Sequence, residues 1–153
     1  MNNAEKLAKS TFSEEDFKTI EAEIKSFENK TSGELIVQFN TNSYGQPYKK
    51  AKRIFEKHNM HQTKERNAVL FVLFLKEQKF AVYGDKGINE KVPEGFWNDV
   101  TEGMSAKFSQ NEFGIGLIEG IRKAGEKLAE YFPVQQDDTN ELSDELLFST
   151  EDE

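Results

Sequence analysis

The sequence contains no cysteine among its 153 residues. Disulfide bonds, a thiolate nucleophile and a cysteine-ligated zinc site are therefore excluded. Long apolar segments are missing too, because the longest uninterrupted run, at 68–75, has eight residues, whereas a membrane-spanning helix needs roughly 20. Residues 1–10 are polar and lack the apolar stretch of a secretory signal. We therefore expect a cytoplasmic protein that does not insert into membranes.

Basic side chains are absent from the C-terminal segment. Residues 133–153 carry eight of the 28 acidic residues and none of the 20 lysines and arginines, so residues 1–132 are formally neutral. Because no basic surface dominates the chain, we expect no nucleic-acid partner. Length and composition predict an N-terminal extension over 1–12, one domain over 13–133 and an acidic, disordered tail over 134–153.

Two apolar segments predict an antiparallel hairpin. The run at 68–75 does not alternate with polar residues, which is typical of a short strand covered on both faces. A four-residue polar connection separates it from a second apolar segment at 80–83, and so short a connection joins antiparallel strands. The start of the first strand and the end of the second should therefore lie at one edge of the sheet.

A strand–helix–strand unit precedes this hairpin. Residues 34–40 predict a strand, 47–59 a helix that begins at Pro47, and 67–75 the next strand. Two strands joined through a helix are expected to run parallel. The start of the first strand then joins the same sheet edge as the residues around 66 and 85.

Helical spacing of apolar residues predicts four further elements. A helix at about 13–29 begins with Ser13 as N-cap and Asp16 at N3, with Phe12 and Phe17 as a hydrophobic staple. A short turn follows Asp85, and longer helices are expected at 93–109 and 113–131, the last with Asn111 as its cap. These elements predict an α/β fold with a mixed central sheet.

The shared sheet edge collects the candidate site. Glu34 and Asp85 are hard oxygen ligands, and Asn67 adds a neutral one, a set that suits Ca²⁺ or Mg²⁺ better than zinc. Arg66 and Asp85 are the candidate catalytic residues. The remaining residues at this edge are Ser32, Gly33, Thr63, Gly84, Lys86 and Gly87. An equally simple interpretation is a structural ion pair of Arg66 with Asp85 or Glu34.

Several motifs in a fixed order resemble one known family. They are Ser32-Gly33-Glu34-Leu35-Ile36-Val37, Thr63-x-x-Arg66-Asn67-Ala68-Val69-Leu70, Gly84-Asp85-Lys86-Gly87-Ile88, Phe96-Trp97 and Phe113-x-x-Gly116-Leu117. Together they resemble the TPM domain over about residues 13–133, and the chain is similar to the family's small soluble bacterial branch. Ala68 stands where the family usually has glycine. The resemblance implies that the fold is a Rossmann-like, three-layer α/β/α sandwich. It also implies divalent-ion binding in some members and an acid phosphatase activity described for a plant member.

Three hypotheses about function follow. The preferred one is a divalent-ion binding module with Asp85, Glu34 and Asn67 as ligands. The second is a metal-assisted acid phosphatase in which Arg66 or Lys86 stabilises developing charge. The third is an adaptor that binds a protein partner through its acidic tail or through the basic face of the helix at 47–59, which carries Lys49, Lys50, Lys52, Arg53 and Lys57. In the tail, Leu142, Leu146, Leu147 and Phe148 could form one helical turn on the partner. We expect a monomer.

Overall fold

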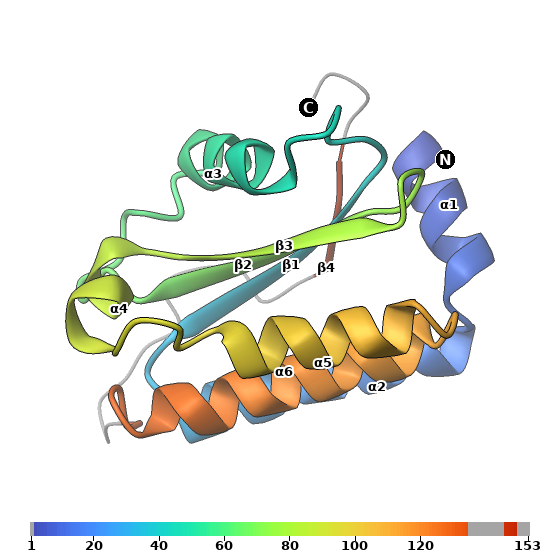
Figure 1. The fold of residues 1–153 in the computed structure, drawn as a ribbon. Helices are drawn as coiled ribbons and strands as arrows, with labels where there is room; N and C mark the ends of the chain where they lie inside the picture. The colour runs from blue at the N-terminus through green and yellow to red at the C-terminus, as the bar shows by residue number, and fades with distance from the viewer. Residues whose placement is uncertain (1, 135–145, 150–153) are drawn as a thin grey trace.

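The computed structural model describes residues 2–134 and 146–149 and centres on a mixed sheet with strand order β3-β2-β1-β4 (Figure 1). Strands β1 (Glu34–Asn40) and β2 (Ala68–Phe74) are parallel, with Glu34 opposite Ala68. Strand β3 (Lys79–Gly84) returns antiparallel to β2, with Gly84 opposite Val69. The predicted hairpin and strand–helix–strand unit are confirmed.

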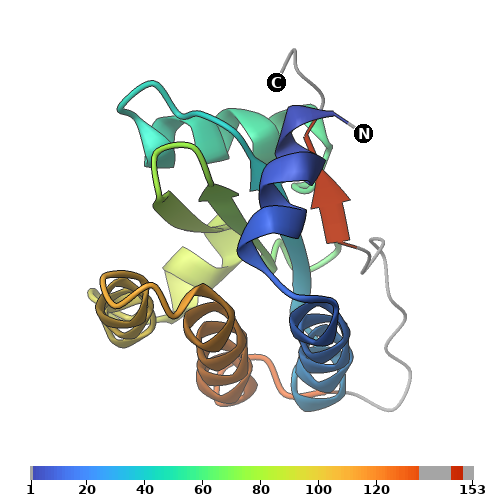
Figure 2. The same ribbon diagram turned by 90° about the vertical axis from the view of Figure 1, so that its right-hand side faces the viewer.

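Helices cover both faces of this sheet. Helix α3 (Pro47–Lys57) lies on one face, and α2 (Glu14–Lys30), α5 (Asn98–Phe108) and α6 (Phe113–Ala129) lie side by side on the other (Figures 1 and 2). Along β2, Leu70 and Val72 pack beneath α3, whereas Val69 and Phe71 belong to the core beneath the three helices. Every residue of β1 and β2 is buried. The unbroken apolar run thus reflects two covered faces, and the predicted three-layer fold is confirmed.

Local sequence signals fix how the helices begin and pack. The Ser13 hydroxyl accepts the Asp16 N–H at 3.0 Å, and the Asp16 carboxylate accepts the Ser13 N–H, also at 3.0 Å, so the capping box is confirmed. The Phe12 and Phe17 rings of the staple lie 5.9 Å apart. On α6, a Cβ added at Gly116 would lie 2.7 Å from the Phe108 ring, which explains why glycine is needed where α5 and α6 pack together.

Two helix starts differ from the prediction. Helix α5 begins at Asn98 rather than 93, because Gly95 adopts a left-handed conformation (φ 79°) that interrupts the helix after Pro93. Helix α6 begins after Glu112, which makes no side-chain cap, and the expected cap Asn111 is instead a left-handed turn residue (φ 60°). The short helix after Asp85 is present as α4 (Lys86–Lys91).

The two terminal segments carry more structure than the sequence predicts. Residues 146–148 form β4 (Leu146–Phe148), which runs parallel to β1 with Phe148 opposite Phe39, so the prediction of a disordered tail is wrong for this part. Their rings stack with centroids 5.5 Å apart. Leu146, Leu147 and Phe148, which were expected in a helical turn, are strand residues instead, so that prediction is wrong for them. Leu142 and the other residues at 135–145 and 150–153 lie outside the described residues.

The N-terminal extension forms helix α1 (Asn3–Thr11), which buries Ala4 and Ala8. The Asn2 side chain caps this helix and also donates to the carbonyl oxygen of Ser149 at 2.8 Å. Helix α1 therefore lies at the end of the sheet where β1 and β4 finish (Figure 2).

Candidate functional site

Three loops meet where β1 and β2 begin and β3 ends, as the topology predicts. The Glu34 N–H donates to the carbonyl oxygen of Asn67 at 3.4 Å, and the Asp85 N–H donates to that of Ala68 at 3.0 Å. Residues 31–34, 63–67 and 84–87 are therefore tied together by backbone hydrogen bonds. In Figure 1 this is the end of the sheet beside α4.

Arg66 and Asp85 form a bidentate ion pair at this edge. Arg66 Nε lies 2.6 Å from Asp85 Oδ2, and Arg66 Nη2 lies 2.8 Å from Oδ1. The Asp85 side chain is 4% exposed and that of Arg66 is 36% exposed. The hydrogen bond that Arg66 donates to the Asp85 carboxylate raises the pKa of Arg66 above its usual value, so the guanidinium stays charged. Of the two interpretations offered by the sequence, the structure thus contains the ion pair.

Asp85 also begins the helix that follows it. Its Oδ1 atom accepts the N–H of Lys86 at 2.7 Å, which makes Asp85 the N-cap of α4. The carboxylate therefore accepts three hydrogen bonds. Because an ionised carboxylate offers about four acceptor directions, one direction on Oδ2 is left by these three contacts.

Close backbone packing holds Arg66 in position. Arg66 adopts a left-handed conformation (φ 52°), and its N–H closes a turn on the carbonyl oxygen of Thr63 at 3.3 Å. A Cβ added at Gly87 would lie 2.2 Å from the Glu65 carbonyl oxygen and 2.5 Å from that of Arg66. Only glycine lets α4 approach this loop so closely.

The other predicted ligands are both buried. Glu34 is 5% exposed and Asn67 is 2% exposed. Asn67 Nδ2 donates to Ser32 Oγ at 3.3 Å, and Ser32 Oγ donates to Glu65 Oε2 at 3.2 Å. Asn67, Ser32 and Glu65 thus form a chain of polar contacts between the first two loops.

Strand alternation indicates which carboxylates share a face. Ile36 and Ala68 pack into the core beneath α3, with Tyr83 beside them. Glu34 lies two residues before Ile36, and Asp85 lies two residues after Tyr83, so both belong to the α3 face. Between them stands Ala68, whose single methyl group occupies little space. The two acidic residues therefore flank one small residue at the edge of the sheet.

Comparison with known proteins now places the chain in a family. A family model described as the TPM domain matches residues 8–127. The chain belongs to the TPM domain family. A search of curated proteins finds no match.

Several solved structures have the same fold as this TPM domain. The NMR structure of the BA42 protein from the psychrophilic bacterium Bizionia argentinensis is similar with a TM-score of 0.84 and 36% identity, over 90% of this chain and 95% of that one. The N-terminal domain of a P. gingivalis protein matches with a TM-score of 0.64 and 15% identity, over 79% and 78% of the two chains. The N-terminal domain of cg2496 from Corynebacterium glutamicum matches at 0.58 and 11%, over 91% and 82%. At these lower identities the likeness concerns the fold alone.

The TPM domain brings together the site residues that the sequence predicts, with one addition. Glu65 was not among them, and it binds Ser32 through its side chain and contacts Gly87 through its backbone. Its only sequence signal was its place between Thr63 and Arg66. Gly84 lies beneath Trp97, because a Cβ there would be 3.3 Å from the indole ring. Within 2–134 and 146–149, no group of three or more acidic, histidine or cysteine side chains is arranged to hold a metal ion.

Some expectations are not tested by these findings. None of the helices in the described part of this TPM domain is long and apolar enough to cross a membrane. Cytoplasmic location, a monomeric state, the absence of a nucleic-acid partner and the identity of any ion stay predictions.

Proposed function

We propose that this protein is a divalent-cation binding module that takes Ca²⁺ or Mg²⁺ at the edge of the sheet formed by residues 31–34, 63–67 and 84–87. The observation that carries the proposal is the pair of buried acidic residues Glu34 and Asp85 on one face, with Ala68 of the intervening strand β2 between them. Burying carboxylates costs free energy unless positive charge or hydrogen bonds compensate. Arg66 and the Lys86 N–H compensate Asp85, and a divalent cation would supply further positive charge to both acids.

The donor set fits a hard cation that keeps part of its water shell. Mg²⁺ binds through one or two carboxylates and retains several waters, and Ca²⁺ accepts carboxylate, amide and backbone oxygens. Glu34 and Asp85 would supply carboxylate oxygens, and Asn67 would supply its side-chain oxygen. No larger cluster of acidic side chains is required for this mode of binding.

Arg66 makes the proposed binding a competition. Its guanidinium occupies two acceptor directions of Asp85, at 2.6 Å and 2.8 Å. A cation near Asp85 would be repelled by this charge, by about 1 kcal/mol for a unit charge at 4 Å in water and by more where water is excluded. Because the Arg66 side chain is partly exposed, it can move into solvent when a cation binds. We therefore expect the affinity for the cation to be modest. We also expect the Arg66 side chain to leave Asp85 when the cation binds.

Calorimetric titration with CaCl₂ and MgCl₂ tests the proposal on three proteins. Wild type should bind one ion. Asp85→Asn should abolish binding while keeping an oxygen that can cap α4. Arg66→Gln should strengthen binding by about tenfold, because it removes a competing charge. Arg122→Gln is the matched control. Arg122 forms a similar ion pair elsewhere in the molecule, with Arg122 Nη2 lying 2.7 Å from Glu23 Oε1.

The Arg66→Gln arm separates a binding site from a structural ion pair. If Arg66 and Asp85 only stabilise the fold, Arg66→Gln lowers the unfolding temperature and creates no tighter binding. Absence of heat in both wild type and Arg66→Gln contradicts the proposal. Equal binding by wild type and Asp85→Asn contradicts the assigned ligands.

The alternative of a metal-assisted phosphatase uses the same residues. Arg66 and Asp85 bind each other, so neither is placed as a free catalytic group in this arrangement. We therefore favour binding over catalysis. Aryl-phosphate hydrolysis that disappears in Asp85→Asn would favour the phosphatase. The adaptor hypothesis invokes the acidic tail, most of which lies outside the described residues, and the basic face of α3. Deletion of 134–153 followed by a pull-down tests the contribution of the tail.

A further inference from the structure

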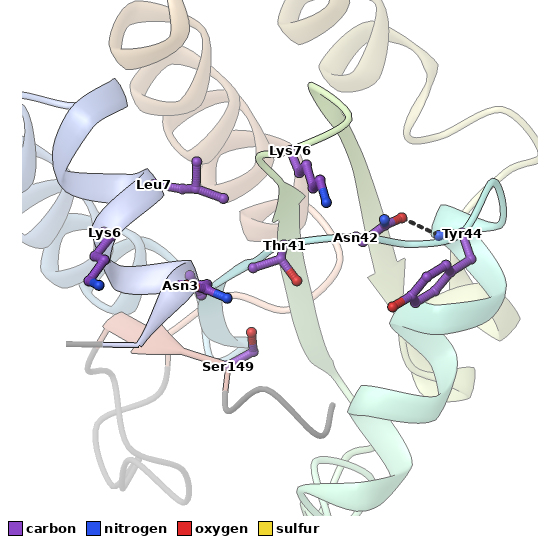
Figure 3. A pocket seen from close by; sticks show the side chains of 9 residues that line it. Asn3, Lys6, Leu7, Thr41, Asn42, Tyr44, Lys76 and Ser149 are labelled. Atoms are coloured by element: carbon purple, nitrogen blue, oxygen red, sulfur yellow. Dashed lines mark hydrogen bonds between the residues drawn. The ribbon is translucent and has the colours of Figure 1, made fainter.

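A second concave region lies at the opposite end of the strands. Its volume is about 630 Å³, within the range of small-molecule sites. It lies where the parallel strands β1 and β4 both finish, beside helix α1 (Figure 3). In open α/β sheets, ligands bind in the crevice outside the carboxyl ends of parallel strands. The lining residues are Asn3, Ala4, Lys6, Leu7, Thr41, Asn42, Tyr44, Lys76 and Ser149.

The loop that forms one wall is held in a defined conformation. The Glu77 carboxylate accepts the backbone N–H groups of Ser43 and Gly45, and the Lys76 N–H donates to the Thr41 carbonyl oxygen at 3.0 Å. Asn42 Oδ1 accepts the N–H of Tyr44 at 2.7 Å. These contacts fix the loop before any ligand binds, which lowers the entropic cost of binding.

The charges on the lining select an anion. Lys6 and Lys76 contribute two ammonium groups, and none of the described residues that line the pocket is acidic. The neighbouring acid, Glu77, directs both oxygens to the loop backbone. Figure 3 shows Lys76 extending toward Thr41 and Asn42, with Asn3 and Ser149 close by on the other side. Lysine ammonium groups and neutral polar side chains are common partners of phosphate.

One aromatic ring stands beside this cationic region. Tyr44 is 78% exposed and adopts a left-handed conformation (φ 54°). Lys50 Nζ lies 5.2 Å from the centre of its ring and donates to the Asn42 carbonyl oxygen at 2.7 Å. An exposed ring fixed in this way offers a face on which a planar group can stack.

We infer that this pocket binds a small phosphorylated metabolite with a planar ring, of the size of a nucleoside monophosphate. The phosphate lies near Lys76 and the polar side chains of Thr41, Asn42 and Ser149, and the ring lies against Tyr44. The site is independent of the proposed cation site, because the two lie at opposite ends of β1.

Backbone NMR titration of the full chain with AMP, inorganic phosphate and adenosine tests this inference. AMP should shift the amide signals of residues 3–7, 41–45, 76 and 149 in a saturable way. Inorganic phosphate and adenosine should bind more weakly than AMP. Lys76→Gln should weaken AMP binding about fivefold or more, the factor expected for losing one charge contact of about 1 kcal/mol. Tyr44→Gly should weaken the binding of AMP and leave the binding of inorganic phosphate unchanged. Glycine is chosen because it tolerates the positive φ at this position.

The controls decide between a specific pocket and general charge attraction. Lys123→Gln changes an exposed lysine on α6 and should leave AMP binding unchanged. Equal weakening by Lys76→Gln and Lys123→Gln, or shifts scattered over the surface, overturns the inference. The sequence after Ser149 contains Glu151, Asp152 and Glu153. A variant that ends at Ser149 should bind AMP at least as tightly. The inference is also overturned if neither the full chain nor the variant that ends at Ser149 responds to AMP.

Discussion

Arg66 contacts Asp85 through two hydrogen bonds of 2.6 Å and 2.8 Å, although 19 residues separate them in the chain. Arg66 stands in the turn that leads into β2, and Asp85 stands between the end of β3 and the start of α4. The pair therefore joins two of the three loops at the edge of the sheet. Its two members give opposite expectations for a cation: Asp85 attracts it and Arg66 competes with it.

Asp85→Ala should lower the free energy of unfolding by about 1–2 kcal/mol, because it removes the N-cap of α4. Asp85→Asn should cost less, since an amide oxygen still accepts the Lys86 N–H. Urea unfolding measures both. Glu23→Ala is the control, because Glu23 pairs with Arg122 on the surface and should cost less than about 1 kcal/mol. Equal losses in Asp85→Ala and Asp85→Asn would refute the capping role.

Gly87→Ala should destabilise the protein by about 1–3 kcal/mol, because its Cβ would meet the backbone oxygens of Glu65 and Arg66 at 2.2 Å and 2.5 Å. The loop at 63–67 must then move away from α4, which should also disturb the Arg66–Asp85 contact. Gly103→Ala is the matched control within α5, where an added Cβ meets nothing within 4 Å. That change should stabilise the helix by about 0.5–1 kcal/mol. Thermal unfolding of both variants should give shifts of opposite sign.

Phe148→Ala should lower the free energy of unfolding by about 2 kcal/mol, somewhat less than for a fully buried phenylalanine. The Phe148 ring stacks on that of Phe39, with centroids 5.5 Å apart, and meets the Phe17 ring edge-on, with centroids 6.4 Å apart. Strand β4 is therefore held by aromatic packing as well as by pairing with β1. Val134→Ala, at a residue 49% exposed, should change stability little. A loss for Phe148→Ala no larger than for Val134→Ala would show that β4 does not stabilise the sheet.

Glu77 should make the loop at 41–46 sensitive to acid. Burial alone raises the pKa of Glu77, but the N–H groups of Ser43 and Gly45 outweigh it and lower the pKa below 4.5. A lowered pKa means that this stabilisation is present above pH 4.5 and is lost as pH falls through the folded-state pKa. Glu77→Gln should therefore lower the unfolding temperature at neutral pH and reduce its decline in acid. Parallel curves for the two proteins below pH 4.5 would contradict this role.

The sequence predicts the sheet well because burial and topology act together there. The uninterrupted run at 68–75 could only be a strand between two covered faces, and the short connection to the next strand required a hairpin. Together with the parallel strand–helix–strand unit, these two inferences bring Glu34, Arg66 and Asp85 to one edge without any knowledge of side-chain positions. The same reasoning left open whether Arg66 pairs with Glu34 or Asp85, because both lie at that edge.

Other features depend on contacts that the local sequence does not contain. Arg66 adopts its left-handed conformation within a turn that packs against Gly87, which is distant in the chain. The three-residue strand β4 lies in an acidic segment whose composition favours disorder, and only the free edge of β1 and the ring of Phe39 make it a strand. Helix α1 looks like a polar extension until Ala4 and Ala8 are seen to be buried. The pocket lined by Lys76 and Tyr44 needs helix α1 and Ser149, the residue that follows β4, as well as the loop after β1.

The most direct test of the cation site is a backbone amide NMR titration of the wild-type protein with Ca²⁺ and Mg²⁺. The proposal predicts saturable shifts confined to residues 31–34, 63–67 and 84–90, together with a change in the Arg66 side-chain Nε–H signal as the guanidinium leaves Asp85. Shifts centred on the acidic residues beyond 134, with the Arg66 signal unchanged, would contradict it.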